Sequence, residues 1–119
     1  MRKQLRLRGR KLFDAVFRRG RVWSNRLLVL RALPNQLDHN RYGFVTSRRL
    51  GNAVVRNRVR RRLREGLRSL PVCHGWDVVI SARPVAAQAD FHDLKRAVTD
   101  LLARSSLLED ASDLDRSPR

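Results

Sequence analysis

Hydrophobic residues recur along the chain in two patterns, one typical of helices and one typical of strands. Over residues 10–19 they fall on one face at helical spacing, and Gly20 follows as a helix end. Residues 27–33 form an apolar, partly β-branched run, and residues 42–47 resume strand character after a turn-rich segment. These two runs predict an antiparallel hairpin with a long loop, preceded by a candidate short strand over residues 21–24.

The second half of the chain predicts a helix, a strand and a final helix. Asn52 is a candidate cap for a helix over residues 53–70, whose apolar residues fall within about 120° of the helix circumference. Residues 76–82 have three consecutive apolar residues at their centre, which indicates a strand buried on both faces. Asp90 is a candidate cap for the last helix, whose apolar positions continue to Leu108.

The order of the predicted elements is helix, two or three strands, helix, strand, helix. Such a chain makes an α+β fold, with one sheet and packed helices in a single small domain. We expect this domain to span residues 10–108. Residues 1–9 are basic with few turn or cap signals and are expected to form a flexible arm, whereas the acidic residues 109–119 are expected to form a disordered tail.

Charge is distributed unevenly along the 119 residues, which include 27 Lys and Arg against 11 Asp and Glu, a net charge of +16. Residues 1–68 hold 21 of these basic residues and only three of the acidic ones. This asymmetry places the positive charge on elements that can form one face, so we expect a polyanion as the partner. Hydrophobic residues still make up 42% of the chain, which indicates a packed basic domain.

The helix predicted over residues 53–70 carries most of the candidate binding residues. Asn57, Arg61, Arg64 and Arg68 lie opposite its apolar stripe, Arg58 and Arg60 widen this basic face, and Arg56 and Arg62 flank the stripe. Glu65 is the only acidic residue among them, so the arginines repel one another at a cost that a bound polyanion would remove. A merely solvated helix face is the alternative interpretation.

Arg48 and Arg49 precede the cap residue Asn52. The free amides and the dipole at a helix N-terminus, together with two guanidinium groups, would hold a phosphate. A plain loop followed by an ordinary helix cap explains Asn52 equally well, so both interpretations stay open.

Phe13 and Phe17 stand four residues apart on one face of the first predicted helix, among basic neighbours. This spacing fits two side chains packed in the core, and it also fits an aromatic platform for unstacked bases. Periodicity does not separate the two interpretations.

The sequence gives no support for catalysis or metal binding by the protein itself. The three histidines are scattered, without a Ser, Cys or carboxylate at the spacing of a triad, and the basic half has too few acids for a metal-dependent nuclease. A single thiol, Cys73, excludes an intramolecular disulfide, and no apolar run has the length of a membrane span. We therefore expect a cytoplasmic protein with no catalytic residue, no metal site and no membrane partner.

Residues 48–65 read Arg-Arg-Leu-Gly-Asn-Ala-Val-Val-Arg-Asn-Arg-Val-Arg-Arg-Arg-Leu-Arg-Glu. This stretch resembles the RNR signature of the bacterial ribonuclease P protein component, which is a highly specific motif. Weaker likeness covers most of the chain and includes Asp14, Phe17 and residues 42–47, 77–83 and 105–107.

The resemblance implies an αβββαβα fold with one central sheet and a left-handed βαβ crossover, against the usual right-handed preference. It also implies the protein subunit of ribonuclease P, an endonuclease that removes the 5′ leader from precursor tRNA. Catalysis would then lie in the RNA subunit with its bound Mg²⁺. The partners would be that catalytic RNA and precursor tRNA, with no protein partner required.

Matching positions imply roles for individual residues. With the cap residue included, the expected RNA-binding residues are Arg48, Arg49, Asn52, Arg56, Asn57, Arg58, Arg60, Arg61 and Arg64. Phe13 and Phe17 match the aromatic positions of a cleft between the first helix and the sheet, where the leader lies in the family. Arg31 stands at a strand position that often carries an aromatic residue in relatives, so a cationic contact is expected there instead.

Two other functions are compatible with the charge alone. One is a ribosomal or assembly protein that binds structured RNA without processing it, and the other is a basic DNA-binding protein. The RNR signature favours the ribonuclease P subunit, and the sequence has no recognisable DNA-reading motif.

Overall fold

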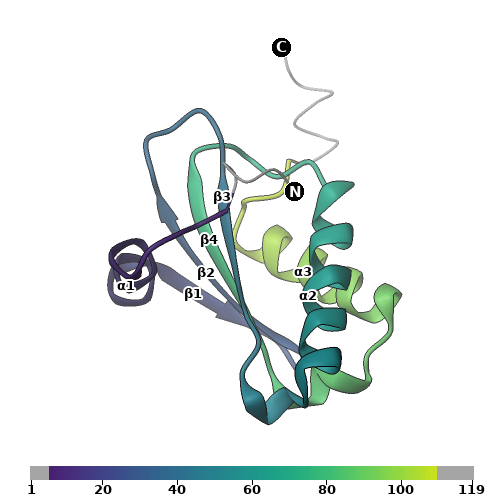
Figure 1. The fold of residues 1–119 in the computed structure, drawn as a ribbon. Helices are drawn as coiled ribbons and strands as arrows, with labels where there is room; N and C mark the ends of the chain where they lie inside the picture. The colour runs from purple at the N-terminus through teal and green to yellow at the C-terminus, as the bar shows by residue number, and fades with distance from the viewer. Residues whose placement is uncertain (1–5, 110–119) are drawn as a thin grey trace.

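The structure is a computed structural model that describes residues 6–109. It contains a four-stranded mixed sheet, in the order β1-β2-β4-β3, with helices on both faces (Figure 1). In chain order the elements are α1 (Arg10–Arg19), β1 (Arg21–Ser24), β2 (Leu28–Pro34), β3 (Arg41–Val45), the 3₁₀ turn η2 (Arg48–Leu50), α2 (Ala53–Arg68), β4 (Trp76–Ala82), the 3₁₀ turn η3 (Pro84–Gln88) and α3 (Phe91–Arg104). The predicted α+β fold with its αβββαβα order is confirmed.

The main hydrophobic core lies between one face of the sheet and the helices α2 and α3. Successive residues of a strand point to opposite faces, so alternate apolar residues of β2 and β4 face these helices. Fully buried members of this core are Leu28, Leu30, Val78, Ile80, Val59, Leu63, Leu94 and Leu101. The apolar stripe predicted for α2 is therefore its core face.

Helix α1 packs on the opposite face of the sheet, over a smaller apolar cluster. Val16 of α1 is buried there against Val79 of β4, with Phe13 packed half-buried beside them. Because Val79 faces α1 while its neighbours face α2 and α3, β4 is buried on both faces. This confirms the two-sided burial predicted for residues 76–82.

The hairpin predicted between residues 27–33 and 42–47 is wrong. Strand β4 lies between β2 and β3, paired antiparallel with β2 and parallel with β3. A strand that is apolar on both faces is best placed at the centre of a sheet, where both faces are covered. The β3–α2–β4 connection is thus a parallel crossover, and its left-handed sense stays a prediction.

Helix α3 begins at its predicted cap but ends earlier than predicted. The Asp90 carboxylate accepts a hydrogen bond from the backbone N–H of Asp93 at 2.8 Å. Shortly after the helix end, Ser106 takes the left-handed conformation with φ 63°. The chain therefore leaves the helical path, and Leu108 forms an isolated bridge with Val72.

The N-terminal segment is attached to the outer edge of β3. The Leu7 N–H donates to the Tyr42 carbonyl oxygen at 2.8 Å, and the Leu7 side chain is buried. The rest of the predicted arm, residues 1–5, lies outside the described residues, as does most of the predicted tail, residues 110–119. Over residues 6–109, no helix is long and apolar enough to span a membrane.

Candidate nucleic-acid interface

Helix α2 starts from a tightly defined turn. Gly51 has a φ of 149°, in the region that favours glycine, and a Cβ there would lie 3.0 Å from Val55. The Asn52 side-chain oxygen accepts a hydrogen bond from the Val55 N–H at 3.0 Å, which confirms Asn52 as the helix cap. Arg48 and Arg49 stand on η2 immediately before this turn, and both are exposed. The predicted phosphate-binding residues therefore share one exposed segment at the start of α2.

The solvent-facing side of α2 carries the positions that helical geometry places opposite the core. Asn57, Arg61 and Arg68 are exposed there, and Arg64 is half-buried. None of the three arginines has an ion-pair partner within residues 6–109. This side of α2 thus presents unneutralised guanidinium groups, the group best suited to phosphate contacts.

Two arginines predicted near this basic face are instead tied to the η3 region. Arg58 Nη2 donates to the Ala87 carbonyl oxygen at 3.3 Å, and Arg62 Nη1 donates to the Ala89 carbonyl oxygen at 2.8 Å. Arg58 is half-buried, as is Arg56. Arg58 and Arg62 thus connect α2 to the segment before α3, and their hydrogen bonds contribute to the stability of the fold.

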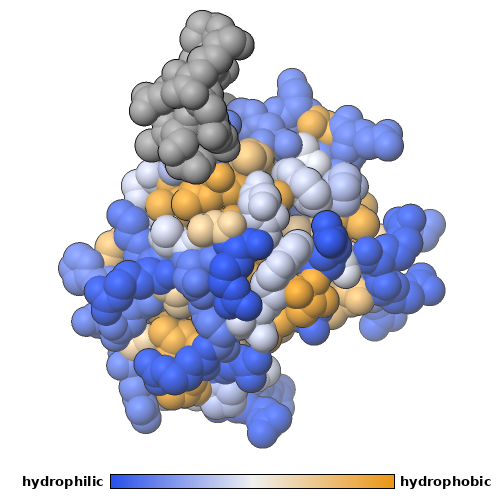
Figure 2. Space-filling model, turned by 180° about the vertical axis from the view of Figure 1, so that it is seen from behind, coloured by the Kyte–Doolittle hydropathy of each residue, from blue (hydrophilic) through white to orange (hydrophobic). Residues whose placement is uncertain are grey.

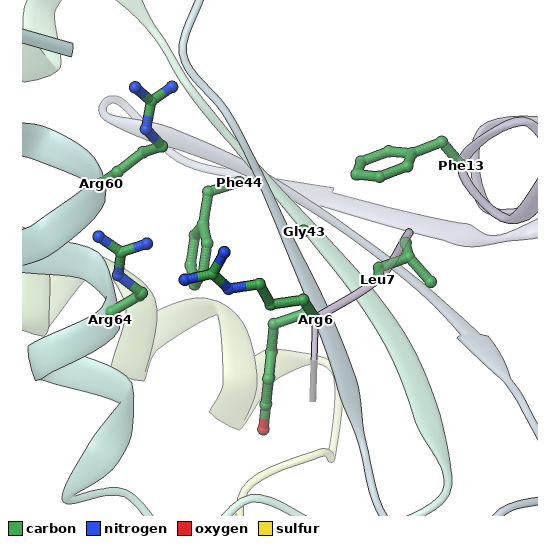
Figure 3. Close-up of a pocket in the computed structure, with 8 residues that line it drawn as sticks. Arg6, Leu7, Phe13, Gly43, Phe44, Arg60 and Arg64 are labelled. Atoms are coloured by element: carbon green, nitrogen blue, oxygen red, sulfur yellow. The ribbon is translucent and has the colours of Figure 1, made fainter. Parts of the chain in front are cut away.

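Arg60 joins α2 to the end of β3. Its guanidinium donates to the Thr46 hydroxyl at 2.5 Å and also to the Asn57 side-chain oxygen. Both acceptors are neutral, so the positive charge of Arg60 stays available. Arg60 and Arg64 line a hollow of about 270 Å³ beside β3, together with Arg6, Leu7, Phe13, Tyr42, Gly43 and Phe44 (Figure 3).

On the other face of the sheet, the structure brings Phe17 and Arg31 together. Phe17 is 43% exposed, and the Arg31 guanidinium carbon lies 4.4 Å from the centroid of its ring. Phe13 lies deeper, because its ring covers Gly43, where a Cβ would come within 2.5 Å of the ring. Of the two aromatic residues predicted for the cleft, Phe17 is at the surface and Phe13 is shared between core and surface.

The described acidic residues do not gather into a cation-binding group. Asp77 is buried and accepts two hydrogen bonds from Arg41, each at 2.8 Å, and one from Asn35 at 3.0 Å. The hydrogen bond to Asp77 raises the pKa of Arg41. Within residues 6–109, no cluster of three or more His, Cys, Asp or Glu side chains is placed to hold a metal ion.

The surface seen from behind α2 and the sheet is mainly hydrophilic, with small separate hydrophobic areas (Figure 2). The exposed large hydrophobic residues come from different parts of the chain and are Phe17, Val22, Leu37, Val54 and Val85. On this face, a polar partner fits better than an apolar one.

Comparison with known proteins identifies the family to which the chain belongs. The family model described as Ribonuclease P matches residues 1–106. The chain belongs to the ribonuclease P protein family. The ribonuclease P protein component of Roseiflexus sp. (strain RS-1) is 43% identical, over 98% of both chains. That of Dehalococcoides mccartyi (strain CBDB1) is 38% identical, over 91% of this chain and 90% of its own.

Solved structures of ribonuclease P proteins share the fold. The Staphylococcus aureus RNase P protein superimposes with a TM-score of 0.81 at 25% identity, covering 88% of this chain and 98% of its own. The Thermotoga maritima protein gives a TM-score of 0.77 at 30% identity, covering 83% and 96%. These matches confirm the family inferred from the RNR signature and favour the ribonuclease P protein subunit over a ribosomal or assembly protein.

The hollow beside β3 is also lined by residues that the sequence did not indicate as candidate RNA-binding residues. Arg6, Tyr42 and Phe44 line it together with the predicted Arg60 and Arg64. Two signals were present in the sequence: the alternation of aromatic residues along β3 and the four-residue spacing of the arginines on α2. Neither signal shows alone that the two elements lie side by side.

Proposed function

We propose that this ribonuclease P protein assists a catalytic RNA in removing the 5′ leader of precursor tRNA. The protein would bind the RNA subunit with α2 and the leader with the surface between α1 and the sheet. The observation that carries this proposal is the presence of two candidate RNA-binding surfaces on opposite faces of one sheet. The first surface is the exposed side of α2 around Arg61, and the second is formed by Phe17 and Arg31 on the α1 face.

The α2 surface supports binding of a highly charged, structured RNA. Arg48, Arg49 and Arg61 are exposed, and no ion pair within residues 6–109 involves them. Arginine makes bidentate contacts with phosphates, and each contact releases counterions, so such a surface binds RNA with strong salt dependence. Several such phosphate contacts together suit a lasting association between the protein and an RNA subunit.

The α1 surface supports binding of a single strand such as a leader. An exposed aromatic ring offers a stacking platform to any base, since every base has a π-face. The Arg31 guanidinium beside Phe17 adds positive charge for the backbone of that strand. Stacking without base-specific hydrogen bonds suits leaders of varied sequence.

Hydrolysis of the phosphodiester bond is assigned in this proposal to the RNA subunit and the Mg²⁺ that it binds. Two observations support this assignment: the buried carboxylate of Asp77 is already engaged by Arg41 and Asn35, and within residues 6–109 no three His, Cys, Asp or Glu side chains are grouped to hold a metal ion. The protein would contribute affinity and positioning of the precursor.

The test is reconstitution with the cognate RNA subunit. We expect no cleavage of precursor tRNA by the protein alone, and we expect the protein to accelerate cleavage by the RNA mainly when Mg²⁺ is low. The gain should grow with leader length and be absent for binding of mature tRNA. Cleavage by protein alone, surviving rigorous removal of RNA and contaminating nuclease, would overturn the proposal.

A further inference from the structure

A groove runs between β3 and α2, mainly on the side of β3 away from Phe17, and its first hollow reaches around the edge of β3 to Leu7 and Phe13. Tyr42 and Phe44 form its floor, since they alternate with Gly43 along the strand and pack against the main core beneath α2. Both rings are half-buried, so part of each stays accessible. Neither ring belongs to the predicted leader surface on the other face of the sheet.

Three arginines surround the Phe44 end of this groove. Arg60 and Arg64 are four residues apart on α2 and therefore project from the same side of the helix. Arg6 comes from the N-terminal segment, which the Leu7–Tyr42 hydrogen bond attaches to β3. Figure 3 shows these three guanidinium groups on the same side of β3 as the Phe44 ring, whereas Phe13 lies on the opposite side.

The groove continues along α2 beyond Tyr42. A second hollow of about 240 Å³ shares Tyr42 with the first and is also lined by Leu67, Arg68 and His74. Arg68 follows Arg64 at the same four-residue spacing, so one row of arginines borders both hollows. The groove therefore extends over two adjoining hollows.

The groove is positive without an internal counter-charge. None of the described residues that line either hollow is acidic. The Arg6 and Arg64 side chains make no hydrogen bond or ion pair within residues 6–109, and Arg60 bonds only to neutral groups. Bringing three like charges together has a cost that bound phosphates would remove.

We propose that this groove binds an unpaired segment of the RNA subunit, with one base stacked on Phe44 and the adjoining phosphates on Arg6 and Arg64. The proposal rests on the proposed function, because it uses the same α2 surface. Unpaired nucleotides fit the aromatic floor, since only unstacked bases offer a free face to a protein ring. The RNA subunit is the occupant because the three arginines and the Phe44 ring lie on the α2 side of β3, across the strand from the predicted leader surface.

The test measures the affinity of the full-length protein for the RNA subunit as a function of salt concentration. Phe44→Leu keeps an apolar side chain against the core and removes the π-face, so it should weaken binding at least about fivefold without changing the salt slope. Arg6→Ala removes a phosphate contact and should flatten the log–log slope by about 0.7. Phe91→Leu and Arg26→Ala are matched controls outside the groove and should change neither quantity.

Combining the two groove variants tests whether they share one nucleotide. Phe44→Leu with Arg6→Ala should weaken binding by less than the product of the two separate losses, because each variant already impairs the same site. Unchanged affinity in both single variants would overturn the proposal. Should Phe44→Leu fail to fold, Arg6→Ala still decides, since the Arg6 side chain is exposed.

Two further measurements separate this proposal from its alternatives. A groove variant that weakens binding of long-leader precursor but not of the RNA subunit would assign the groove to the leader and overturn the proposal. If Arg61→Ala weakens binding of the RNA subunit while the groove variants do not, only the groove assignment fails. If Arg61→Ala also has no effect, the proposed role of α2 fails with it.

Discussion

The guanidinium carbon of Arg31 on β2 lies 4.4 Å from the centroid of the Phe17 ring on α1. This cation–π contact joins the first helix to the sheet at the protein surface, where such contacts contribute about 0.5–1 kcal/mol. It orients the ring of a residue that is still 43% exposed. Phe17 therefore stands where a base could reach it, and its contact with the leader stays a prediction.

Phe17→Ala should weaken binding of precursor tRNA with a long leader by about 5- to 150-fold, the value of one stacking contact. Binding of mature tRNA and the melting temperature should change little, because the ring is largely outside the core. The comparison variant is Phe13→Ala, whose half-buried ring should make it lower the melting temperature more. A loss of more than about 3 kcal/mol in the free energy of unfolding, without a leader-dependent change in binding, would show that Phe17 is a core residue and not a leader-binding one.

Arg61→Ala and Arg58→Ala should differ, although both remove a guanidinium from α2. Arg61 is exposed, so its loss should flatten the salt dependence of RNA binding by about 0.7–0.9 and leave the melting temperature unchanged. Arg58 donates to the Ala87 carbonyl oxygen, so its loss should also destabilise the fold by about 0.5–1.5 kcal/mol. Equal melting temperatures for the two variants would contradict the structural role of Arg58.

Gly43→Ala should destabilise the protein by about 1–3 kcal/mol, as overpacking of a core does. The new Cβ would lie 2.5 Å from Cζ of Phe13 and force the ring away from β3. Adding Phe13→Leu should recover part of the loss, since the shorter side chain leaves room for the methyl group. Chemical denaturation of the single and double variants measures this coupling, and strictly additive losses would show that the two residues do not meet.

Asp90→Ala should lower the melting temperature near neutral pH, and the difference from the wild type should shrink in acid. The hydrogen bond from the Asp93 backbone N–H holds the pKa of Asp90 below its usual value of 3.8. The carboxylate therefore stabilises the folded protein fully above that value, and its contribution is lost as the pH falls through the lowered pKa. Asp90→Asn keeps an acceptor that does not titrate, so it should resemble the wild type near neutral pH and lack this acid dependence. A difference between the wild type and Asp90→Ala that stays constant in acid would contradict the assignment.

Local signals in the sequence were sufficient for the starts of the helices and for the burial of β4, whereas α2 and α3 end before their predicted last residues. Periodic apolar residues and Gly20 predicted α1 correctly, and Asn52 was correctly predicted as the cap of α2. The hairpin was wrong because strand pairing depends on residues far apart in the chain. The two-sided burial of residues 76–82 was the one signal that pointed to a central strand.

The candidate site was predictable only in part for a similar reason. Helical geometry correctly placed Arg61 opposite the core, but it contains no information about what packs beside the helix. The bond from Arg62 to Ala89 and the neighbourhood of Phe44 and Arg64 arise when η3 and β3 come to lie against α2. Such contacts follow from topology, which periodicity does not reveal.

The central position of β4 also sets the timing of folding during synthesis. A nascent chain that stops before residue 76 already contains every predicted RNA-binding residue, yet it lacks the strand that joins β2 to β3. The β1–β2 pairing is local, but completion of the sheet must wait for contacts of β4 with distant parts of the chain, which slows folding. The protein therefore gains its RNA-binding shape only after β4 has left the ribosome and entered the sheet.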